Sequence, residues 1–148
     1  MPGEGDLFMP LHRQDMSAVE ERYEQCVQWW AASPLVDAGL VVTRDADGEA
    51  LEVLHGPVAP RSVACALELP CEGAIVVAPP GQLCVRGYVV FDAEGMPGAA
   101  AYRHIEDYLN TNGLAAVGDQ VMHRLLRHRI VDGVSLRYDE VVVPVRRL

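Results

Sequence analysis

The sequence predicts an α+β domain in which a β-α-β-β unit occurs twice, giving an antiparallel sheet with two helices on one face and a groove between them. Two observations predict this fold. The order of strand-like and helix-like hydrophobic spacing is the same in both halves of the chain. Short motifs also recur at one offset of 74 residues: Gly39-Leu40 as Gly113-Leu114, Asp45 as Asp119, and Leu69-Pro70 as Val143-Pro144. We therefore expect one domain over residues 1–148, with pseudo-repeats of about 1–73 and 74–148.

The first half opens with a short strand at about Leu7 to Met9, followed by a helix. Ser17-Ala18-Val19-Glu20 has the pattern of a capping box, which satisfies free N–H groups at a helix start. Apolar residues then recur at helical spacing up to Trp30. Ser33-Pro34 ends the helix, because the residue before proline avoids the α conformation.

Two extended segments complete the first half. Leu40 to Arg44 leads into a turn at Asp47-Gly48, and Ser62 to Leu69 alternates between apolar and polar residues. Both are expected to be strands.

The second half repeats this order. Leu83 to Phe91 reads as a strand after the Pro79-Pro80-Gly81 turn. A helix follows from about Ala99, with its apolar stripe at Tyr102, Ile105, Tyr108 and Leu109.

Asn112-Gly113 supplies a left-handed cap for that helix. Two strands then end the chain, roughly Gln120 to His128 and Ser135 to Val145, joined through Asp132-Gly133.

Composition excludes several classes of function. The net charge is −9 and the chain has no lysine, which argues against direct nucleic-acid binding and excludes a phosphate-binding loop with lysine. The one dense basic stretch, His123 to Arg129, is interpreted as the solvated side of a strand or turn. No apolar run approaches the roughly 20 residues that span a bilayer, and the N-terminus is acidic. We expect a cytoplasmic protein that does not bind membranes; a homodimer is compatible with the sequence.

Four cysteines, Cys26, Cys65, Cys71 and Cys84, show no Cys-x-x-Cys pair. We expect buried free thiols in a reducing compartment. The histidine pair His123 and His128 is flanked by arginines that would repel a cation. The sequence therefore predicts no metal site and no cofactor.

The last strand contains a carboxylate on an apolar face. Side chains alternate along a strand, so Leu136, Tyr138, Glu140 and Val142 share one face. A buried glutamate requires a partner or a proton. Two interpretations stay open at this point: Glu140 is solvated at a sheet edge, or it is a cleft carboxylate that awaits a cationic or hydrogen-bonding ligand.

The few aromatic residues are candidates for ligand contact. Trp30 continues the core stripe of the first helix, whereas Trp29 lies at its flank and is the better stacking candidate. Tyr102 and Tyr108 either pack in the core or line the groove. Tyr88 and Tyr138, both on strands, are natural hydrogen-bond partners for a nearby carboxylate such as Glu140.

A family resemblance emerges from the second half. It is carried by Gly81, Tyr88, Pro97, Tyr102, Ile105, Leu109, Gly113-Leu114-Ala115-Ala116-Val117-Gly118 and Glu140-Val141-Val142-Val143-Pro144-Val145. In order and spacing these resemble a GyrI-like effector-binding domain, which has a Gly-Leu-x-x-x-Gly turn and a terminal Glu-x-x-x-Pro-Val strand. The resemblance covers nearly all of the chain in layout, with its motifs concentrated after Leu83.

The resemblance implies a small-molecule-binding module. Similar domains form the ligand-sensing part of MerR-type and AraC-type transcription regulators and also occur alone, and they bind hydrophobic or cationic amphipathic drugs and natural products. Glu140 corresponds to the family's ligand-facing glutamate. At the positions of the family's Glu-x-Tyr pair this chain has Met122 and Arg124, so the groove is less acidic and Met122 forms an adaptable wall.

Two other functions stay open from the sequence. Some GyrI-like proteins hydrolyse reactive natural-product electrophiles; here Glu140 would be the general base, with Tyr138 or Tyr102 assisting. The acidic surface also permits a protein-interaction module such as a gyrase modulator. The absence of the second groove acid favours binding over catalysis.

Overall fold

The computed structural model describes residues 5–10, 16–77, 81–93 and 96–148 of the chain. The chain divides into two compact units. Unit 1 comprises Met1–Leu40 and Leu54–Gly81, and unit 2 comprises Val41–Val53 and Gln82–Leu148. The sequence-based expectation of one domain with pseudo-repeats of about 1–73 and 74–148 stays a prediction.

Unit 1 combines short strands with two helices. Its elements are β1 (Asp6–Phe8), α1 (Met16–Trp30), α2 (Arg61–Ala66), β4 (Ile75–Val77) and parts of β2 (Asp37–Arg44) and β3 (Ala50–Pro60). Strand β1 pairs antiparallel with β3 on one side and β4 on the other, with Leu7 opposite both Ala59 and Val76. The core of unit 1 consists of Leu7, Met9, Cys26, Trp29, Val36, Ala59 and Ala64.

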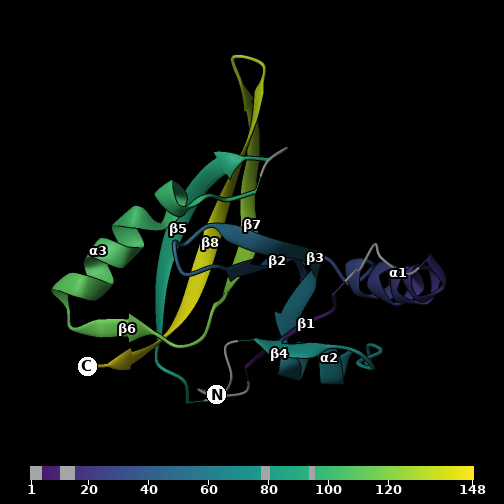
Figure 1. The fold of residues 1–148 in the computed structure, drawn as a ribbon. Coiled ribbons are helices and arrows are strands. Elements are labelled where there is room, and N and C mark those ends of the chain that lie inside the picture. Colours follow the sequence, from purple (N-terminus) through teal and green to yellow (C-terminus); the bar gives the residue numbers. More distant parts are fainter. Residues whose placement is uncertain (1–4, 11–15, 78–80, 94–95) are drawn as a thin grey trace. The chain divides into compact units, whose positions relative to one another are not determined.

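Unit 2 is built on a long antiparallel sheet. Its elements are β5 (Cys84–Asp92), the 3₁₀-helix η1 (Ala99–Tyr102), α3 (Arg103–Thr111), β6 (Leu114–Ala116), β7 (Gln120–Val131), β8 (Val134–Arg147) and the tip of the β2–β3 hairpin. Strand β8 pairs with β5, β6 and β7 (Figure 1). Helix α3 covers one face, and the core there consists of Val89, Tyr102, Ile105, Leu109, Val121, Val141, Val143 and Val145.

Local sequence signals set the turns of unit 2. Gly113 has φ +62° just after α3 and takes the left-handed conformation expected of the cap. Asp132 and Gly133, with φ of +50° and +78°, join β7 to β8 in a two-residue hairpin turn. A register shift between Leu125 and Arg127 interrupts the β7–β8 ladder. The predicted helix from Ala99 is confirmed by η1 and α3, and the three predicted strands of the second half are confirmed by β5, β7 and β8.

The prediction of a strand over Ser62 to Leu69 is wrong, because this segment contains helix α2 and the turn after it. Pro60 precedes the helix, with φ of −54°, and the N–H of Leu67 donates to the carbonyl of Val63. Val63 and Leu67 fit an alternating pattern, but they are also four positions apart, which is the spacing of one helix face. Strands β3, β4 and β6 were not predicted from the sequence.

Helix α1 buries the opposite tryptophan from the one expected. Trp29 shares a face with Cys26, is fully buried, and donates its indole N–H to the carbonyl of Pro70 at 2.8 Å. Trp30 is 37 % exposed. Residues three apart share a helix face, so Cys26 selects Trp29 for the core. The proposed capping box at 17–20 and most of the turn at 79–81 lie outside the residues whose side chains are described.

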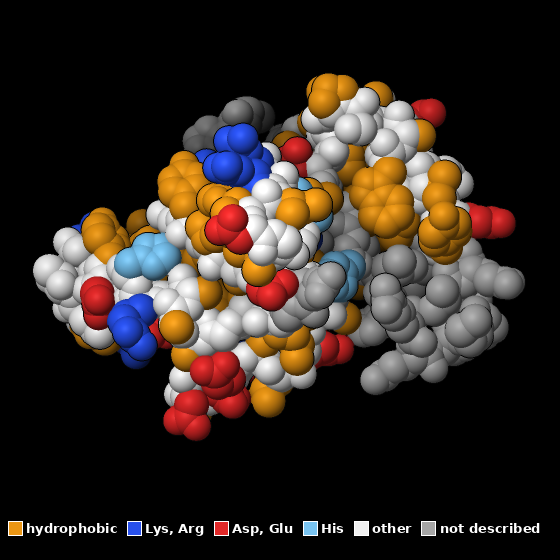
Figure 2. Space-filling model, turned by 90° about the horizontal axis from the view of Figure 1, so that it is seen from above, with side chains coloured by type: hydrophobic (Ala, Val, Ile, Leu, Met, Phe, Trp, Pro, Cys, Tyr) orange, Lys and Arg blue, Asp and Glu red, His pale blue; other side chains and the backbone are white. Residues whose placement is uncertain are grey.

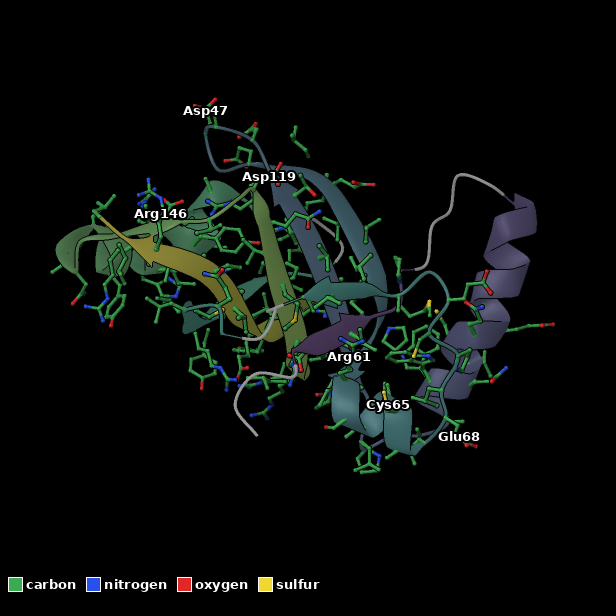
Figure 3. The ribbon with its side chains drawn as sticks, turned by 90° about the horizontal axis from the view of Figure 1, so that it is seen from below. Asp47, Arg61, Cys65, Glu68, Asp119 and Arg146 are labelled. Carbon is green, nitrogen blue, oxygen red and sulfur yellow. The ribbon has the colours of Figure 1, made fainter. Side chains whose placement is uncertain are left out.

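The cysteines also differ from the expectation of four buried thiols. Cys26 is buried and Cys84 half-buried, whereas Cys65 and Cys71 are exposed. Figure 3 shows Cys65 with Arg61 on α2 and Glu68 just beyond it. Among the helices of the described residues, none is long and apolar enough to cross a membrane.

Candidate functional site

A chain of four polar side chains crosses the core of unit 2 beneath η1. The Tyr102 hydroxyl lies 2.7 Å from Nε2 of His123, and Nδ1 of His123 lies 2.8 Å from Oδ2 of Asp139. Arg137 Nε donates to both oxygens of Asp139, at 2.7 and 3.0 Å. His123 and Asp139 are fully buried and Tyr102 nearly so. We call these four residues the buried relay.

The protonation of the buried relay follows from its burial. Burial raises the pKa of Tyr102, so its hydroxyl stays protonated and donates a hydrogen bond to Nε2 of His123. Burial lowers the pKa of His123, and the hydrogen bond from Nδ1 to Asp139 opposes that shift only in part. His123 is therefore neutral, with its proton on Nδ1. The fixed charges of the relay are those of Asp139 and Arg137.

The buried relay is built to stabilise the fold. A tyrosine whose pKa is raised is a weak nucleophile, and its hydroxyl has almost no access to a substrate. The edge-on packing of Phe91 and Tyr102 against the His123 ring, at 5.8 and 5.7 Å between centroids, closes the remaining space. The relay instead fixes β7, β8 and η1 against one another.

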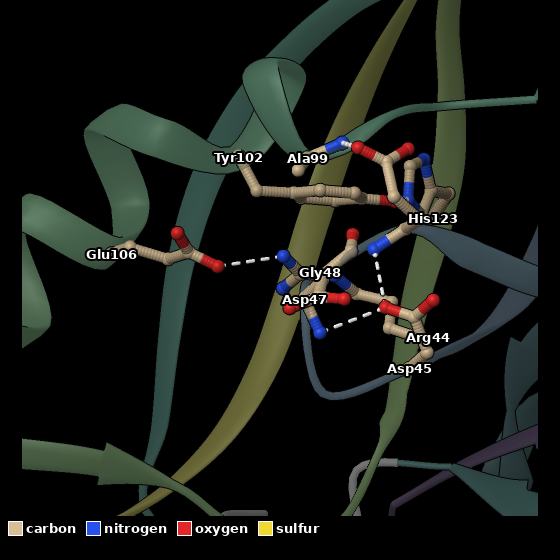
Figure 4. A network of polar contacts seen from close by, with 9 residues as sticks. Arg44, Asp45, Asp47, Gly48, Ala99, Tyr102, Glu106 and His123 are labelled. Carbon is tan, nitrogen blue, oxygen red and sulfur yellow. Dashed lines mark hydrogen bonds and ion pairs between the residues drawn. The ribbon is translucent and has the colours of Figure 1, made fainter.

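The outer side of Tyr102 carries a second network, centred on Arg44 (Figure 4). The Arg44 guanidinium lies 4.2 Å from the centre of the Tyr102 ring, a cation–π contact. It also makes an ion pair of 2.6 Å with Glu106 on α3 and donates to the carbonyl of Gly48 at 2.9 Å. A Cβ on Gly48 would lie 2.5 Å from the guanidinium, and φ there is +84°, so glycine is required at this turn position.

The β2–β3 turn is held in shape by one carboxylate. Asp45 accepts hydrogen bonds from the backbone N–H of Asp47 and of Glu49, at 2.9 and 3.0 Å. The backbone N–H of Arg44 donates to the carbonyl of Asp119 at 2.9 Å. These bonds place the turn beside the start of β7.

A cleft of about 590 Å³ lies between this turn, α3 and the start of β7. We call it the hairpin cleft. It is lined by Arg44, Asp45, Ala46, Asp47, Gly48, Glu106, Ala116, Gly118, Asp119, Gln120, Val121 and Val143. Asp47 and Asp119 lie at the same end of unit 2 (Figure 3). The cleft thus presents four carboxylates and one arginine, and that arginine is already paired with Glu106.

The fully buried carboxylate of β8 is Asp139, one residue before the expected Glu140. Asp139 faces α3 together with Val141 and Val143, whereas Glu140 is half-buried on the opposite face. The cross-strand neighbours of Glu140 are Tyr88 on β5 and Arg124 on β7. An arginine directly opposite makes this position less attractive to a cation than the sequence alone suggests.

The predicted ligand residues fall into three groups. Tyr88, Met122 and Tyr138 share the Glu140 face of the unit 2 sheet; Met122 is buried and Tyr88 is 65 % exposed. Tyr102 is in the core and Tyr108 is exposed on α3. Trp29 and Trp30 belong to unit 1. Figure 2 shows exposed hydrophobic side chains interspersed with charged ones. Neither Glu140 nor Tyr138 lines the hairpin cleft.

Sequence reasoning missed His123, Asp139, Arg44 and Glu106. The basic composition of His123 to Arg129 predicts a solvated stretch, but His123 is fully buried. A signal was present in the sequence: at period two, Val121 and His123 share a face, as do Asp139 and Val141. Comparison of the chain with family models, with curated proteins and with solved structures finds no match.

The lowered pKa of His123 predicts that stability falls on mild acidification. The unfolded chain binds the His123 proton more tightly than the folded chain does. The free energy of unfolding therefore has its full value above the ordinary pKa of 6.5 and decreases as the pH falls below it. One proton limits the slope to about 1.4 kcal/mol per pH unit. Denaturant titrations between pH 7.5 and 5.5 measure it. His123→Gln should flatten the dependence and His128→Gln, at an exposed site, should not; equal slopes for the wild type and His123→Gln would contradict this assignment.

Proposed function

We propose that this protein is a small-molecule-binding effector module for hydrophobic or cationic amphipathic compounds, and that unit 2 binds them in the hairpin cleft. The observation that carries the proposal is the charge of the cleft lining. Four carboxylates face one arginine whose charge Glu106 already matches. The cleft therefore attracts cations and repels anions.

The non-charged part of the cleft lining suits the apolar part of such a ligand. Val121 and Val143 contribute an apolar floor. Asp45 is used by the turn and Glu106 by Arg44, so both are held in fixed positions. Asp47 and Asp119 make no side-chain hydrogen bond or ion pair with the described residues. These two carboxylates are the ones that would meet an ammonium or guanidinium group.

We also propose that the chain has the duplicated layout of a GyrI-like domain, and that this binding module serves in transcriptional regulation or drug sequestration. Strand pairing supports a repeated layout within that proposal, but not the 74-residue offset, which would align β8 with helix α2. In unit 1 the first strand, β1, pairs antiparallel with β3, and in unit 2 the corresponding strand, β5, pairs antiparallel with β8. Each β-α-β-β run therefore has its first strand beside its third.

The proposal is tested with three probes that share one ring system: a naphthylmethylammonium, the neutral naphthalenemethanol and 2-naphthoate. Of the three probes, we expect the ammonium compound to bind the hairpin cleft most tightly. Asp47→Asn and Asp119→Asn should each weaken this binding. Each exposed carboxylate contributes about 0.2–1 kcal/mol, so the double variant should bind roughly two- to thirtyfold more weakly. Fluorescence titration at low and high salt measures this, because exposed charge pairs are screened by salt.

Two variants locate the site. Asp107→Asn, on the exposed side of α3 and outside the cleft lining, is the matched control and should bind as the wild type does. Glu140→Gln should also leave ammonium binding unchanged. A loss of binding in Glu140→Gln alone would place the ligand on the opposite face, as the family resemblance implies. No binding of the ammonium probe at millimolar concentration would reject the proposed function.

A further inference from the structure

The outer edge of strand β5 presents backbone groups that no other strand of the described residues pairs with. β5 is the last strand of the sheet, and its neighbour is β8. The N–H of Val145 donates to the carbonyl of Leu83, and the N–H of Ala93 donates to that of Ser135. The odd-numbered residues of β5 therefore bond to β8, and the N–H and C=O groups of the even-numbered residues point away from it.

One of these outward groups is already used by a side chain. Nε2–H of His104 donates to the outward carbonyl of Tyr88, with 2.7 Å between nitrogen and oxygen. The outward N–H and C=O groups of Cys84 and Arg86 make no hydrogen bond with the described residues. Donors and acceptors that alternate along an extended strand are matched by the backbone of another extended segment.

A cleft of about 440 Å³ runs along this same part of β5. We call it the edge cleft. It is lined by four consecutive residues of the strand, from Cys84 to Gly87, and by His104, Ile105 and Tyr108 of α3, which lies beside β5 (Figure 1). A Cβ on Gly87 would lie 2.9 Å from Cδ1 of Ile105, so glycine is what lets α3 approach the strand this closely. The edge cleft therefore has a strand edge on one side and a helix on the other.

The two faces of β5 offer different side chains to an added segment. Arg86 and Tyr88 lie on the face opposite α3, where Arg86 is exposed and makes no ion pair or hydrogen bond with the described residues. Val85 and Ile105 pack in the core on the α3 face, and the exposed Tyr108 lines the same cleft. A residue added opposite Arg86 would place its side chain beside a free guanidinium, and its two neighbours would face the apolar side of the cleft.

We propose that the edge cleft binds a short extended segment of a protein partner as an added antiparallel strand, with an acidic residue opposite Arg86 between two apolar residues. Backbone hydrogen bonds to Cys84 and Arg86 hold the segment. The cross-strand pair with Arg86 and the burial of the two apolar side chains beside α3 select its sequence. The antiparallel direction gives the more stable pairing per residue.

A short segment suits this edge better than a second copy of the chain does. Pairing along the whole of β5 would require the carbonyl of Tyr88, which His104 already uses. A segment beside Cys84 and Arg86 leaves that hydrogen bond intact. None of the residues of the edge cleft lines the hairpin cleft, so this inference goes beyond the proposed function and does not rest on it.

A charge exchange between peptide and protein tests the proposed pair. The probe is a labelled heptapeptide with a glutamate between two valines at its centre, followed by fluorescence anisotropy. The wild type should prefer it over the same peptide with lysine at the centre, and Arg86→Glu should reverse this preference, each change being roughly two- to fivefold. Arg127→Glu is the matched control: it removes an exposed arginine of β7 on the same sheet face and should keep the wild-type preference. An unchanged preference in Arg86→Glu would overturn the proposal.

Methylation of the peptide backbone separates strand addition from binding through side chains alone. N-methylation of the central glutamate removes the N–H that would donate to the carbonyl of Arg86, so it should abolish binding. N-methylation of a flanking valine, whose N–H points away from β5 in an antiparallel pair, should leave binding nearly unchanged. Equal binding of the two methylated peptides would overturn the proposal.

Amide hydrogen exchange gives a readout that needs no variant. The N–H groups of Val85 and Gly87 bond to β8 and should exchange slowly with or without the peptide. That of Arg86 should exchange fast in the free protein and about tenfold more slowly at saturating peptide. Unchanged exchange at Arg86 would overturn the proposal, and so would slow exchange that appears on raising the protein concentration alone, because a second copy would then occupy the edge. Loss of ammonium binding in the Asp47 and Asp119 variants leaves these results intact, so the two clefts are tested separately.

Discussion

Replacing Asp139 by alanine is expected to lower the free energy of unfolding by about 3 to 5 kcal/mol, because it removes one partner of a buried charge pair. Asp139 accepts hydrogen bonds from His123 and Arg137 in the core of unit 2. Without it, the Arg137 guanidinium keeps its charge in a largely buried position. Its Nη2 atom already has no hydrogen-bond partner among the described residues, so no alternative acceptor stands ready.

Urea unfolding followed by circular dichroism measures this loss. The matched control is Asp107→Ala on the exposed side of α3, where we expect a change within about 0.5 kcal/mol. Asp139→Asn keeps an acceptor oxygen but loses the charge, and its cost should fall between those of the two alanine variants. A loss below about 1 kcal/mol in Asp139→Ala would contradict the assignment of a buried charge pair.

Replacing Gly56 by alanine is the second large effect that we expect. Gly56 is a buried residue of β3, and a Cβ there would overlap the carbonyl oxygen of Met9 and lie 2.9 Å from its carbonyl carbon. The neighbour is backbone, held by a hydrogen bond from Met9 N–H to the carbonyl of Pro57 at 3.0 Å. It cannot rotate away, so we expect a loss of about 3 kcal/mol, the upper end of the range for overpacked cores.

The matched control for this variant is Gly98→Ala. A Cβ on Gly98 would meet only an oxygen of the Glu49 side chain, at 3.2 Å, and a carboxylate can move aside. Its backbone, with φ of −83°, accepts alanine without strain. We expect a change of less than about 1 kcal/mol for Gly98→Ala in the same denaturant titration. Equal stability of Gly56→Ala and the wild type would show that β1 and β3 are not packed this closely.

Elements with strong local signals could be predicted from the sequence. The apolar stripe of α3, its glycine cap and the Asp132-Gly133 turn are each set by residues close together in the chain. The segment at Arg61–Ala66 could not be assigned, because a single helical turn and a short strand produce the same spacing of apolar residues. Six residues are too few to distinguish the two periods.

The site depended on contacts that local patterns do not encode. Arg44 and Glu106 are 62 positions apart, and Tyr102 and His123 are 21 apart. The carboxylate on β8 illustrates the remaining difficulty. Alternation correctly places Asp139 and Glu140 on opposite faces, but only the packing of α3 decides which face is dry.

The placement of Trp29 and Trp30 gives the protein a built-in pair of optical reporters. Both tryptophans belong to unit 1, while Tyr88, Tyr102, Tyr108 and Tyr138 all belong to unit 2. Indole emission therefore reports on unit 1 alone, and most of the tyrosine absorbance reports on unit 2. During denaturation, coincident changes in the two signals would reveal a single cooperative transition, and separated changes would reveal two.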